Sequence, residues 1–488
     1  MIKYISTRNS KHVVNSSEAI LNGQAPDGGL YIPSELEAIR LDYHEVIDND
    51  FKGMAKVVWN KFFPDYGEQT IDMLVERSYK DKFADPAITP LKKVADGYVL
   101  ELYHGPTAAF KDVALSALPN LMTRAREMND FKDEILILTA TSGDTGSAAL
   151  CGFSDVPGTR IIVFYPDGGV SETQRLQMVT AAGANTCACA VRGNFDDAQT
   201  GVKKLFREIP QPVDGVSLSS ANSINIGRLV PQVVYYFSAY KQLLDMGEIE
   251  DGDKVDFTVP TGNFGDIMAG YFAMKMGLPV NRLICASNKN DVLTEFLQTG
   301  RYDRKRTFFK TTSPSMDILV SSNLERLLYY VCGEEHSRQY MKELSENGEY
   351  QISPEELAEI QSVFTGLAAS DEDGSDAIGK VYADEHYLMD THTAIAWSCF
   401  KQYSGGEAAL PNVILSTASP YKFCRSVLSA LGETLESSDK ANMAKCESVT
   451  GVAVPAGLKG IFSREVRHTD VIDCDEMKDY VEGNYYAG

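Results

Sequence analysis

One lysine stands at the junction between an expected strand and an expected helix, where an amine could do chemistry. Lys111 follows the turn-rich residues 105–109 and precedes a helical pattern over 112–121, while residues 98–102 upstream are typical of a strand. Because a helix N-terminus carries partial positive charge, such a lysine is either solvated or held in a cleft with a lowered pKa. A lysine of the second kind can form a Schiff base with an aldehyde. Lys111 on its own leaves both interpretations open.

A glycine-rich loop at residues 262–266 (GNFGD) follows an apolar run at 255–259 and precedes a helical pattern over 267–276. Glycines let the backbone approach a ligand closely, and the free amides of a helix N-terminus bind phosphate. The loop has neither a Walker A sequence nor the spacing of a dinucleotide-binding fingerprint. It is therefore either a phosphate site of another kind or a tight structural turn.

Two further loops place hydroxyl groups where apolar runs end. In TSGDTGS, Ser142, Asp144 and Thr145 could bind a carboxylate or a ring hydroxyl, and helix capping is the alternative. In STASP, the Thr417 hydroxyl could hydrogen-bond a heteroaromatic nitrogen or only satisfy the local backbone.

A fourth candidate segment, at 217–229, places Asn225 and Arg228 three residues apart on one helical face, near Ser223. A guanidinium group binds phosphate through two hydrogen bonds, so Arg228 predicts an oxyanion site. A surface salt bridge is the alternative.

The charge balance excludes two classes of partner. The chain has 46 basic and 68 acidic residues, a net charge of −22. Binding to nucleic acid or to an anionic membrane needs a basic face, so neither is expected. An anionic ligand must instead be captured by local donors. At 488 residues the chain is also too long for a single hydrophobic core, so two or three domains are expected.

The nine cysteines include no C-x-x-C pair, which argues against a disulfide framework and favours a reducing compartment. No apolar stretch resembles a signal sequence or approaches membrane-spanning length, so a cytoplasmic protein is expected. His386 and His392 lack the H-E-x-x-H spacing, and no metal site is expected.

The elements that must position these loops follow an α/β pattern. Continuous apolar runs separated by helical stretches predict parallel strands buried on both faces, with ligands bound beyond their carboxyl ends. The first 90 residues suggest a small helical cap, and the acidic stretch 370–375 a solvated loop. The apolar runs lie at 135–138, 160–165, 186–191, 255–259, 282–286 and 413–415.

Six segments in order resemble the threonine synthase family, of the longer bacterial and fungal type, within the fold-type II pyridoxal-phosphate enzymes. They are APDGGLYIP, HGPTAAFKD, TSGDTGSAA, SSANSINIGRL, PTGNFGD and STASPYKF, and they span nearly the whole chain. The family often has histidine at the position of Ser419 and alanine at that of Tyr421. Many fold-type II relatives have asparagine where Asp144 stands, so an aspartate there needs a shared proton or must point elsewhere.

The resemblance implies two α/β domains around a cofactor cleft, with an N-terminal cap. The implied ranges are 1–90 for the cap, 91–245 and 246–425 for the α/β domains, and 426–488 for a C-terminal packing segment. Lys111 would be the catalytic residue and would bind the aldehyde of pyridoxal 5'-phosphate. The cofactor would also be bound by Gly262, Asn263, Phe264, Gly265, Asp266 and Thr417, and the substrate by Ser142, Asp144, Thr145, Ser223, Asn225 and Arg228.

The reaction implied is the conversion of O-phospho-L-homoserine and water to L-threonine and phosphate, by γ-elimination of phosphate and then β-addition of water. The alternatives are a related lyase that releases phosphate from another phosphorylated amino acid and a non-catalytic phosphometabolite-binding protein. The protein is expected to be a monomer or a homodimer.

Overall fold

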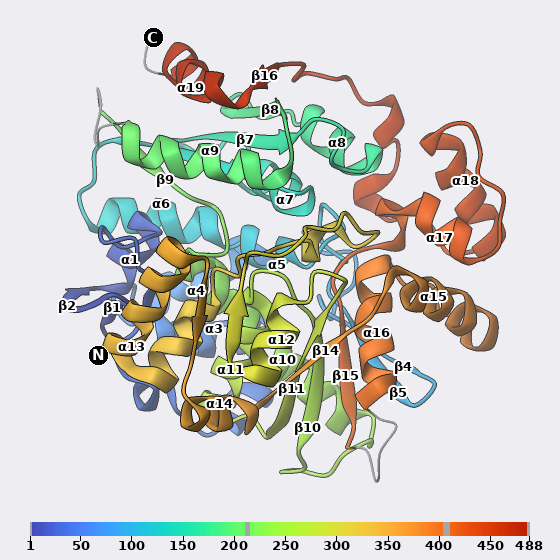
Figure 1. Ribbon diagram of the computed structural model, residues 1–488, viewed down its shortest axis with the longest axis horizontal. Coiled ribbons are helices and arrows are strands. Elements are labelled where there is room, and N and C mark those ends of the chain that lie inside the picture. The colour runs from blue at the N-terminus through green and yellow to red at the C-terminus, as the bar shows by residue number, and fades with distance from the viewer. Residues whose placement is uncertain (1, 210–214, 404–409, 486–488) are drawn as a thin grey trace.

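The computed structural model describes residues 2–209, 215–403 and 410–485, and two large β-sheets organise it (Figure 1). The larger sheet has six strands in the order β14-β11-β10-β15-β5-β4. Five of them run parallel, and the edge strand β4 runs antiparallel to β5. The strands are β4 Leu91–Val94, β5 Gly97–Glu101, β10 Val255–Pro260, β11 Val280–Ser287, β14 Phe364–Ala368 and β15 Asn412–Ser416.

The second sheet has five parallel strands in the order β16-β8-β7-β6-β9. Its inner strands are buried on both faces, which is why they are continuous apolar runs in the sequence. The strands are β6 Glu134–Ala140, β7 Thr159–Pro166, β8 Thr186–Arg192, β9 Val216–Ser219 and β16 Val471–Asp473. All six predicted apolar runs are therefore strands, and the predicted α/β class is confirmed.

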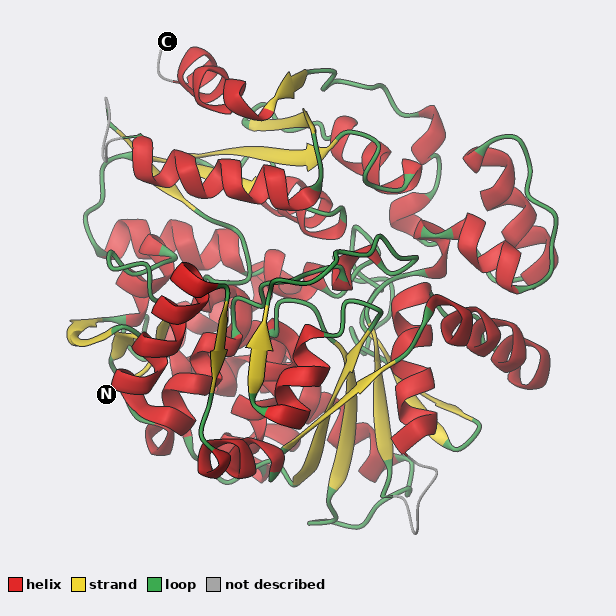
Figure 2. Cartoon of the chain, in the orientation of Figure 1, coloured by secondary structure: helices red, strands yellow, loops and turns green. Residues whose placement is uncertain are grey.

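Helices cover both sheets. Figure 1 shows α9 crossing in front of the five-stranded sheet, and α11 and α16 both contact β10 and β11 of the larger one. Loops collect between the two sheets, where strands from each of them end (Figure 2). The helices of this part are α5 Lys111–Leu115, α6 Leu118–Met128, α7 Asp144–Phe153, α8 Glu172–Val179, α9 Phe195–Glu208, α10 Ile226–Asp245, α11 Gly265–Met276, α12 Val292–Thr299, α13 Leu324–Asn347, α14 Pro354–Gln361, α15 Asp371–Glu385 and α16 Thr391–Tyr403.

The sequence suggested a helical cap for the N-terminal part, but the structure shows strands there as well as helices. This part contains a three-stranded antiparallel sheet in the order β2-β1-β3 beside its helices. Its elements are β1 Tyr4–Ser6, β2 Asn9–Val14, β3 Tyr31–Pro33, α1 Ser16–Asn22, α2 His44–Ile47, α3 Phe51–Phe62 and α4 Glu68–Tyr79. The C-terminal part adds α17 Cys424–Ala430, α18 Asp439–Thr450 and α19 Met477–Tyr485.

Two local predictions were wrong. The helical pattern over 112–121 is two helices, α5 and α6, because Pro119 has no N–H to donate to the preceding turn. The acidic stretch 370–375 opens α15 instead of forming a loop. Ser370 and Asp373 make a reciprocal capping box there, and acidic side chains in a first helical turn complement the helix dipole.

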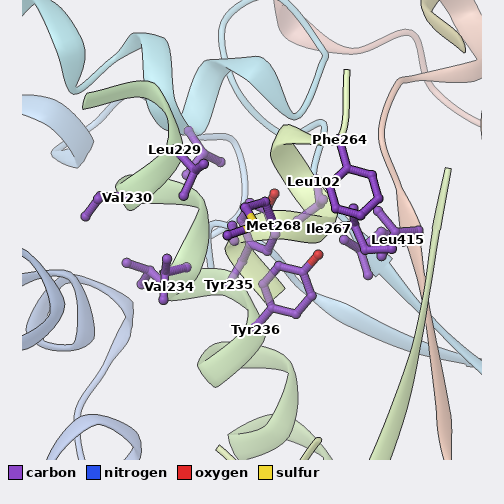
Figure 3. Close-up of a cluster of buried hydrophobic side chains, with 14 of the residues drawn as sticks. Leu102, Leu229, Val230, Val234, Tyr235, Tyr236, Phe264, Ile267, Met268 and Leu415 are labelled. Carbon is purple, nitrogen blue, oxygen red and sulfur yellow. The ribbon is translucent and has the colours of Figure 1, made fainter. Parts of the chain in front are cut away.

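The core beside the glycine-rich loop is drawn in Figure 3, where side chains of α10 and α11 pack together near the ends of β5 and β15. Each fully buried side chain of this size contributes roughly 1.5–3 kcal/mol, so this packing fixes the start of α11 firmly. The labelled residues are Leu102, Leu229, Val230, Val234, Tyr235, Tyr236, Phe264, Ile267, Met268 and Leu415. Across the described ranges, no helix combines the length and apolar character needed to cross a membrane.

Candidate active site

Lys111 is the first residue of α5 and lines a cavity of about 990 Å³. The loop before it is tied to the loop after β15. The Phe110 N–H donates to the Thr417 carbonyl at 2.8 Å, and the Ser419 N–H donates to the Ala108 carbonyl at 3.1 Å. These two bonds bring the amine of Lys111 and the residue Thr417 to the wall of one cavity, although 305 positions of sequence separate them.

The electrostatic surroundings of Lys111 favour its neutral amine. Burial lowers the pKa of Lys111 to about 8; the Asp144 carboxylate opposes that shift, while the positive charges of Arg228 and Lys422 add to it. A lysine with a pKa near 8 is uncharged in roughly a tenth of molecules at about pH 7, several-hundred-fold more than an ordinary lysine. The uncharged amine is the form that attacks a carbonyl and accepts a proton.

The segment 313–323 supports the glycine-rich loop through hydrogen bonds to the backbone of that loop. The Ser321 hydroxyl donates to the Gly262 carbonyl at 2.8 Å, and the Asn323 amide donates to the Asn263 carbonyl at 2.8 Å. A Cβ atom at Gly262 would lie 2.6 Å from the Ser315 carbonyl oxygen, so the close approach of these two segments requires glycine there.

A buried arginine ties this support to two other parts of the site. Arg326 is fully buried, and it donates to the Asn323 side-chain oxygen, to the Ile224 carbonyl at 2.6 Å and to the Tyr31 carbonyl at 3.1 Å. One side chain therefore links the glycine-rich loop, the 217–229 segment and the N-terminal part. Its donors meet neutral oxygens, which identifies it as a structural support of the site.

Helix α11 begins at Gly265, and Phe264 before it adopts the left-handed conformation, with φ at 59°. Asp266 in the first turn accepts hydrogen bonds on one carboxylate oxygen from Tyr235 at 2.5 Å and Tyr236 at 3.0 Å. Burial raises the pKa of Asp266 to about 6, although both tyrosine hydroxyls lower it. Asp266 can therefore be protonated close to neutral pH.

Five buried polar atoms of the cavity residues have no hydrogen-bond partner within the described structure. They are Asn263 Oδ1, Asp266 Oδ2, Ser315 Oγ, Arg228 Nε and Tyr350 Oη, and all five residues line the cavity. Buried polar groups are nearly always paired, so this set is suited to a polar ligand that supplies the missing partners. A reactive amine, a guanidinium group and a glycine-rich helix start fit a ligand with an aldehyde and a phosphate, and pyridoxal phosphate has both.

The other predicted binding residues divide into those that line the cavity and those that do not. Ser142, Thr145, Ser223 and Arg228 line it. Arg228 is 2% exposed and forms no ion pair with a described residue, and burial lowers its pKa to about 10. A buried guanidinium group without a carboxylate is suited to an anionic ligand.

Asn225 takes a different place. Its side-chain oxygen accepts from the Gly227 N–H at 2.9 Å and caps α10, and its amide donates to the Ile20 carbonyl at 2.9 Å. Asn225 is fully buried and is not among the described residues that line the cavity. Its contacts support the geometry of the loop before α10.

Asp144 points to a partner that the sequence did not suggest. Lys422 approaches its carboxylate at 2.7 Å, and Gln174 donates to the same oxygen at 2.8 Å. Burial alone would raise the pKa of Asp144, but Lys422 and Lys111 outweigh it and hold that pKa well below its ordinary value. The aspartate is therefore stabilised as a carboxylate by an ion pair, and no shared proton is needed.

His392 also lines the cavity, although its sequence context matched no metal-binding motif. Its Nδ1 lies 2.7 Å from the Asp390 carboxylate, and its Nε2 accepts from the Ser315 N–H at 3.1 Å. This pairing orients the backbone of Ser315, a cavity residue whose buried hydroxyl has no partner among the described residues. Lys422 could have been noticed as a lysine directly after a strand-end motif, whereas only the fold brings His392 to Ser315.

Comparisons with known proteins agree over the length of the chain. Residues 88–409 match the model described as pyridoxal-phosphate dependent enzyme, residues 3–79 that of the threonine synthase N terminus, and residues 393–481 that of the threonine synthase C-terminal part. Threonine synthase of Pseudomonas aeruginosa is 38% identical, covering 96% of this chain and 95% of that protein. Threonine synthase of Schizosaccharomyces pombe is 37% identical, covering 88% and 89%.

A solved structure leads to the same family. The crystal structure of PLP-bound threonine synthase from Brucella melitensis superposes with a TM-score of 0.86 at 36% identity, covering 99% of each chain. The fold and the lysine-bearing cavity thus define a pyridoxal-phosphate-dependent enzyme of fold type II. Within that class, the chain belongs to the threonine synthase family.

Proposed function

We propose that this chain converts O-phospho-L-homoserine and water into L-threonine and phosphate. The observation that carries the proposal is Lys111, a lysine of lowered pKa in the cavity of a chain that matches threonine synthases along nearly its whole length. In the overall reaction the C–O bond at Cγ breaks and releases phosphate, Cγ becomes a methyl group, and the hydroxyl of water is added at Cβ.

The cofactor, when bound, supplies an electron sink that makes the α-proton of the substrate removable. The neutral amine of Lys111 is suited to accept that proton and to return it at a neighbouring carbon. The half-buried position of Lys111 supports this role, because desolvation lowers the pKa of its amine to about 8, closer to neutral pH, where the group can both accept and release a proton.

We further propose which residues hold the cofactor. The amides at the start of α11, from the loop residues Gly262 to Asp266, would bind its phosphate, and the hydrogen bonds from the 313–323 segment to this loop support a rigid phosphate site. Thr417 is proposed to meet the pyridine nitrogen, supported by the bond that ties its backbone to Phe110 beside Lys111.

The substrate phosphate is proposed to bind Arg228, with the hydroxyls of Ser142, Thr145 and Ser223 around the remaining polar groups. Arg228 is the strongest of these assignments, because its guanidinium group is buried, lines the cavity and has an unpartnered Nε. A buried cation of this kind is stabilised when an anion binds.

The test is to incubate purified protein with pyridoxal phosphate and O-phospho-L-homoserine and to measure threonine and inorganic phosphate. We expect both products in equal amounts and neither from Lys111→Ala. Lys241→Ala is the matched control, because Lys241 pairs with Asp245 on α10 outside the cavity. Phosphate without threonine would favour the alternative lyase, and neither product with the cofactor bound would favour a phosphometabolite-binding protein.

Two expectations about the setting of the protein stay proposals. All nine cysteines are free thiols, which supports a reducing, cytoplasmic location. A monomer or a homodimer is proposed, and light scattering of the purified protein would distinguish them.

A further inference from the structure

The buried ion pair between Lys422 and Asp144 lies next to the reactive lysine. Lys422 sits in the 3-10 turn Pro420–Lys422, and its ammonium is 2.7 Å from Asp144 Oδ1 with both side chains almost fully buried. The same ammonium donates to the Thr107 carbonyl at 3.0 Å, in the loop that leads to Lys111. Lys422 therefore connects the first turn of α7 with the lysine loop.

Such a pair is costly to bury, which makes its position informative. Removing an ammonium and a carboxylate from water costs several kcal/mol for each ion, and a well-packed apolar pair is often as stable. The charged groups that face Lys111 are Asp144 from α7, Arg228 from α10, Asp266 from α11 and Lys422 from the 3-10 turn. Asp144 is the one with the largest effect on the amine.

We propose that Lys422 is a positioning residue that binds the Asp144 carboxylate and so keeps the amine of Lys111 free to react. The inference rests on the proposed function only in taking Lys111 as the reactive amine. Lys422 touches neither the cofactor nor the substrate in this role; it acts through Asp144.

The reasoning follows from which ammonium groups act on Asp144. Within the described structure these are Lys422 and Lys111, with Gln174 as a neutral hydrogen-bond donor. When Lys422 is replaced by a neutral residue, Lys111 becomes the remaining cation that acts on the Asp144 carboxylate. Its ammonium form is then stabilised, both by this new pairing and by the loss of repulsion from Lys422. The fraction of neutral amine falls accordingly.

The experiment compares four proteins: wild type, Lys422→Gln, the charge-preserving control Lys422→Arg, and the double variant Asp144→Asn with Lys422→Gln. The full-length protein is freed of cofactor, and the rate at which it takes up pyridoxal phosphate through Lys111 is followed by visible absorbance from low to high pH. The midpoint of that pH profile reports the titration of the Lys111 amine. No substrate is present, so failure to make threonine would bear on the proposed function alone.

We expect Lys422→Gln to move the midpoint of the pH profile upward by roughly one pH unit or more. At a pH well below the midpoint, the variant should therefore take up pyridoxal phosphate about tenfold more slowly than wild type. In the double variant the attraction of Asp144 is also gone, so the midpoint returns to the wild-type value or below it. Lys422→Arg keeps the charge and should stay near wild type. An unchanged midpoint in Lys422→Gln, or a double variant that shares its raised midpoint, would overturn the proposal.

Folding of the variants is checked by circular dichroism. If Lys422→Gln does not fold, the double variant still decides, because it neutralises both members of the buried pair and so leaves neither of them charged without its partner. Asp144 affects the amine more strongly than Lys422, so the double variant should then titrate below wild type. A midpoint above that of wild type would refute the inference.

Discussion

Replacing Asp266 by asparagine tests how the glycine-rich loop tolerates a carboxyl group beside a phosphate. Asp266 lines the cavity. One of its carboxylate oxygens accepts hydrogen bonds from Tyr235 and Tyr236, and the other has no partner among the described residues. An ionised carboxylate would repel a phosphate in the loop, whereas a protonated one would donate a hydrogen bond to it. Cofactor binding should therefore require a proton on Asp266.

The size of the effect follows from the pKa of Asp266, which burial raises to about 6. At about pH 7.5 such a carboxyl is protonated in roughly 3% of molecules, so protonating it costs about 2 kcal/mol. Asp266→Asn removes that cost, because an amide can accept from both tyrosines and donate to phosphate without taking up a proton. The variant should then bind the phosphate group about 30-fold more tightly at that pH.

The assay uses pyridoxine 5'-phosphate, which has no aldehyde and cannot react with Lys111, and it measures the dissociation constant by fluorescence. Titration of the ligand's own phosphate cancels in the ratio of wild-type to variant dissociation constants. That ratio should be near one at about pH 5.5 and should rise tenfold per pH unit above about pH 6. A ratio that stays constant across this range would refute the reasoning, because Asp266 would then need no proton to accommodate the phosphate.

Three further substitutions have expected outcomes. Arg228→Met removes charge-assisted hydrogen bonds worth roughly 1.5–3 kcal/mol each, so KM for phosphohomoserine should rise at least tenfold, with a smaller rise in Arg228→Lys. Equal KM values in wild type and both variants would contradict the proposal that Arg228 binds the substrate phosphate. Gly262→Ala places a Cβ atom 2.6 Å from the Ser315 carbonyl oxygen. The resulting strain of about 1–3 kcal/mol should weaken cofactor binding tenfold or more. In the control Gly483→Ala the added carbon meets nothing within 4 Å, so this variant should bind the cofactor as wild type does. Arg326→Met leaves three oxygens, two of them buried, without their donor, so the free energy of unfolding should fall by about 3 kcal/mol or more. The exposed control Arg40→Met should change it by almost nothing, and equal melting temperatures for the two variants would contradict the role of Arg326 as a support.

Much of the fold was readable from local patterns. Strands buried on both faces must be apolar throughout, so the continuous runs at 135–138 and 255–259 identified β6 and β10. Pairing between strands that are far apart in the sequence gives no comparable local pattern. Residues 91–101 were grouped with the lysine-bearing segment, yet β5 pairs with β15 in the larger sheet, and β16 from the C-terminal segment pairs with β8. These pairings depend on how the whole chain crosses between the sheets.

The sequence by itself determined the chemical groups of the site: a lysine at a helix start, glycines where a backbone must come close, and an arginine in an acidic chain. Each of these depends on residue type and near neighbours, so a local pattern can carry it. Only the tertiary structure decided their partners, such as Lys422 for Asp144, Ser315 for His392, and the backbone of Ile20 and Gly227 for Asn225. The physical reason is that the charge and free amine of Lys111 are set by groups within a few ångströms in space, and packing brings those groups together from across the chain.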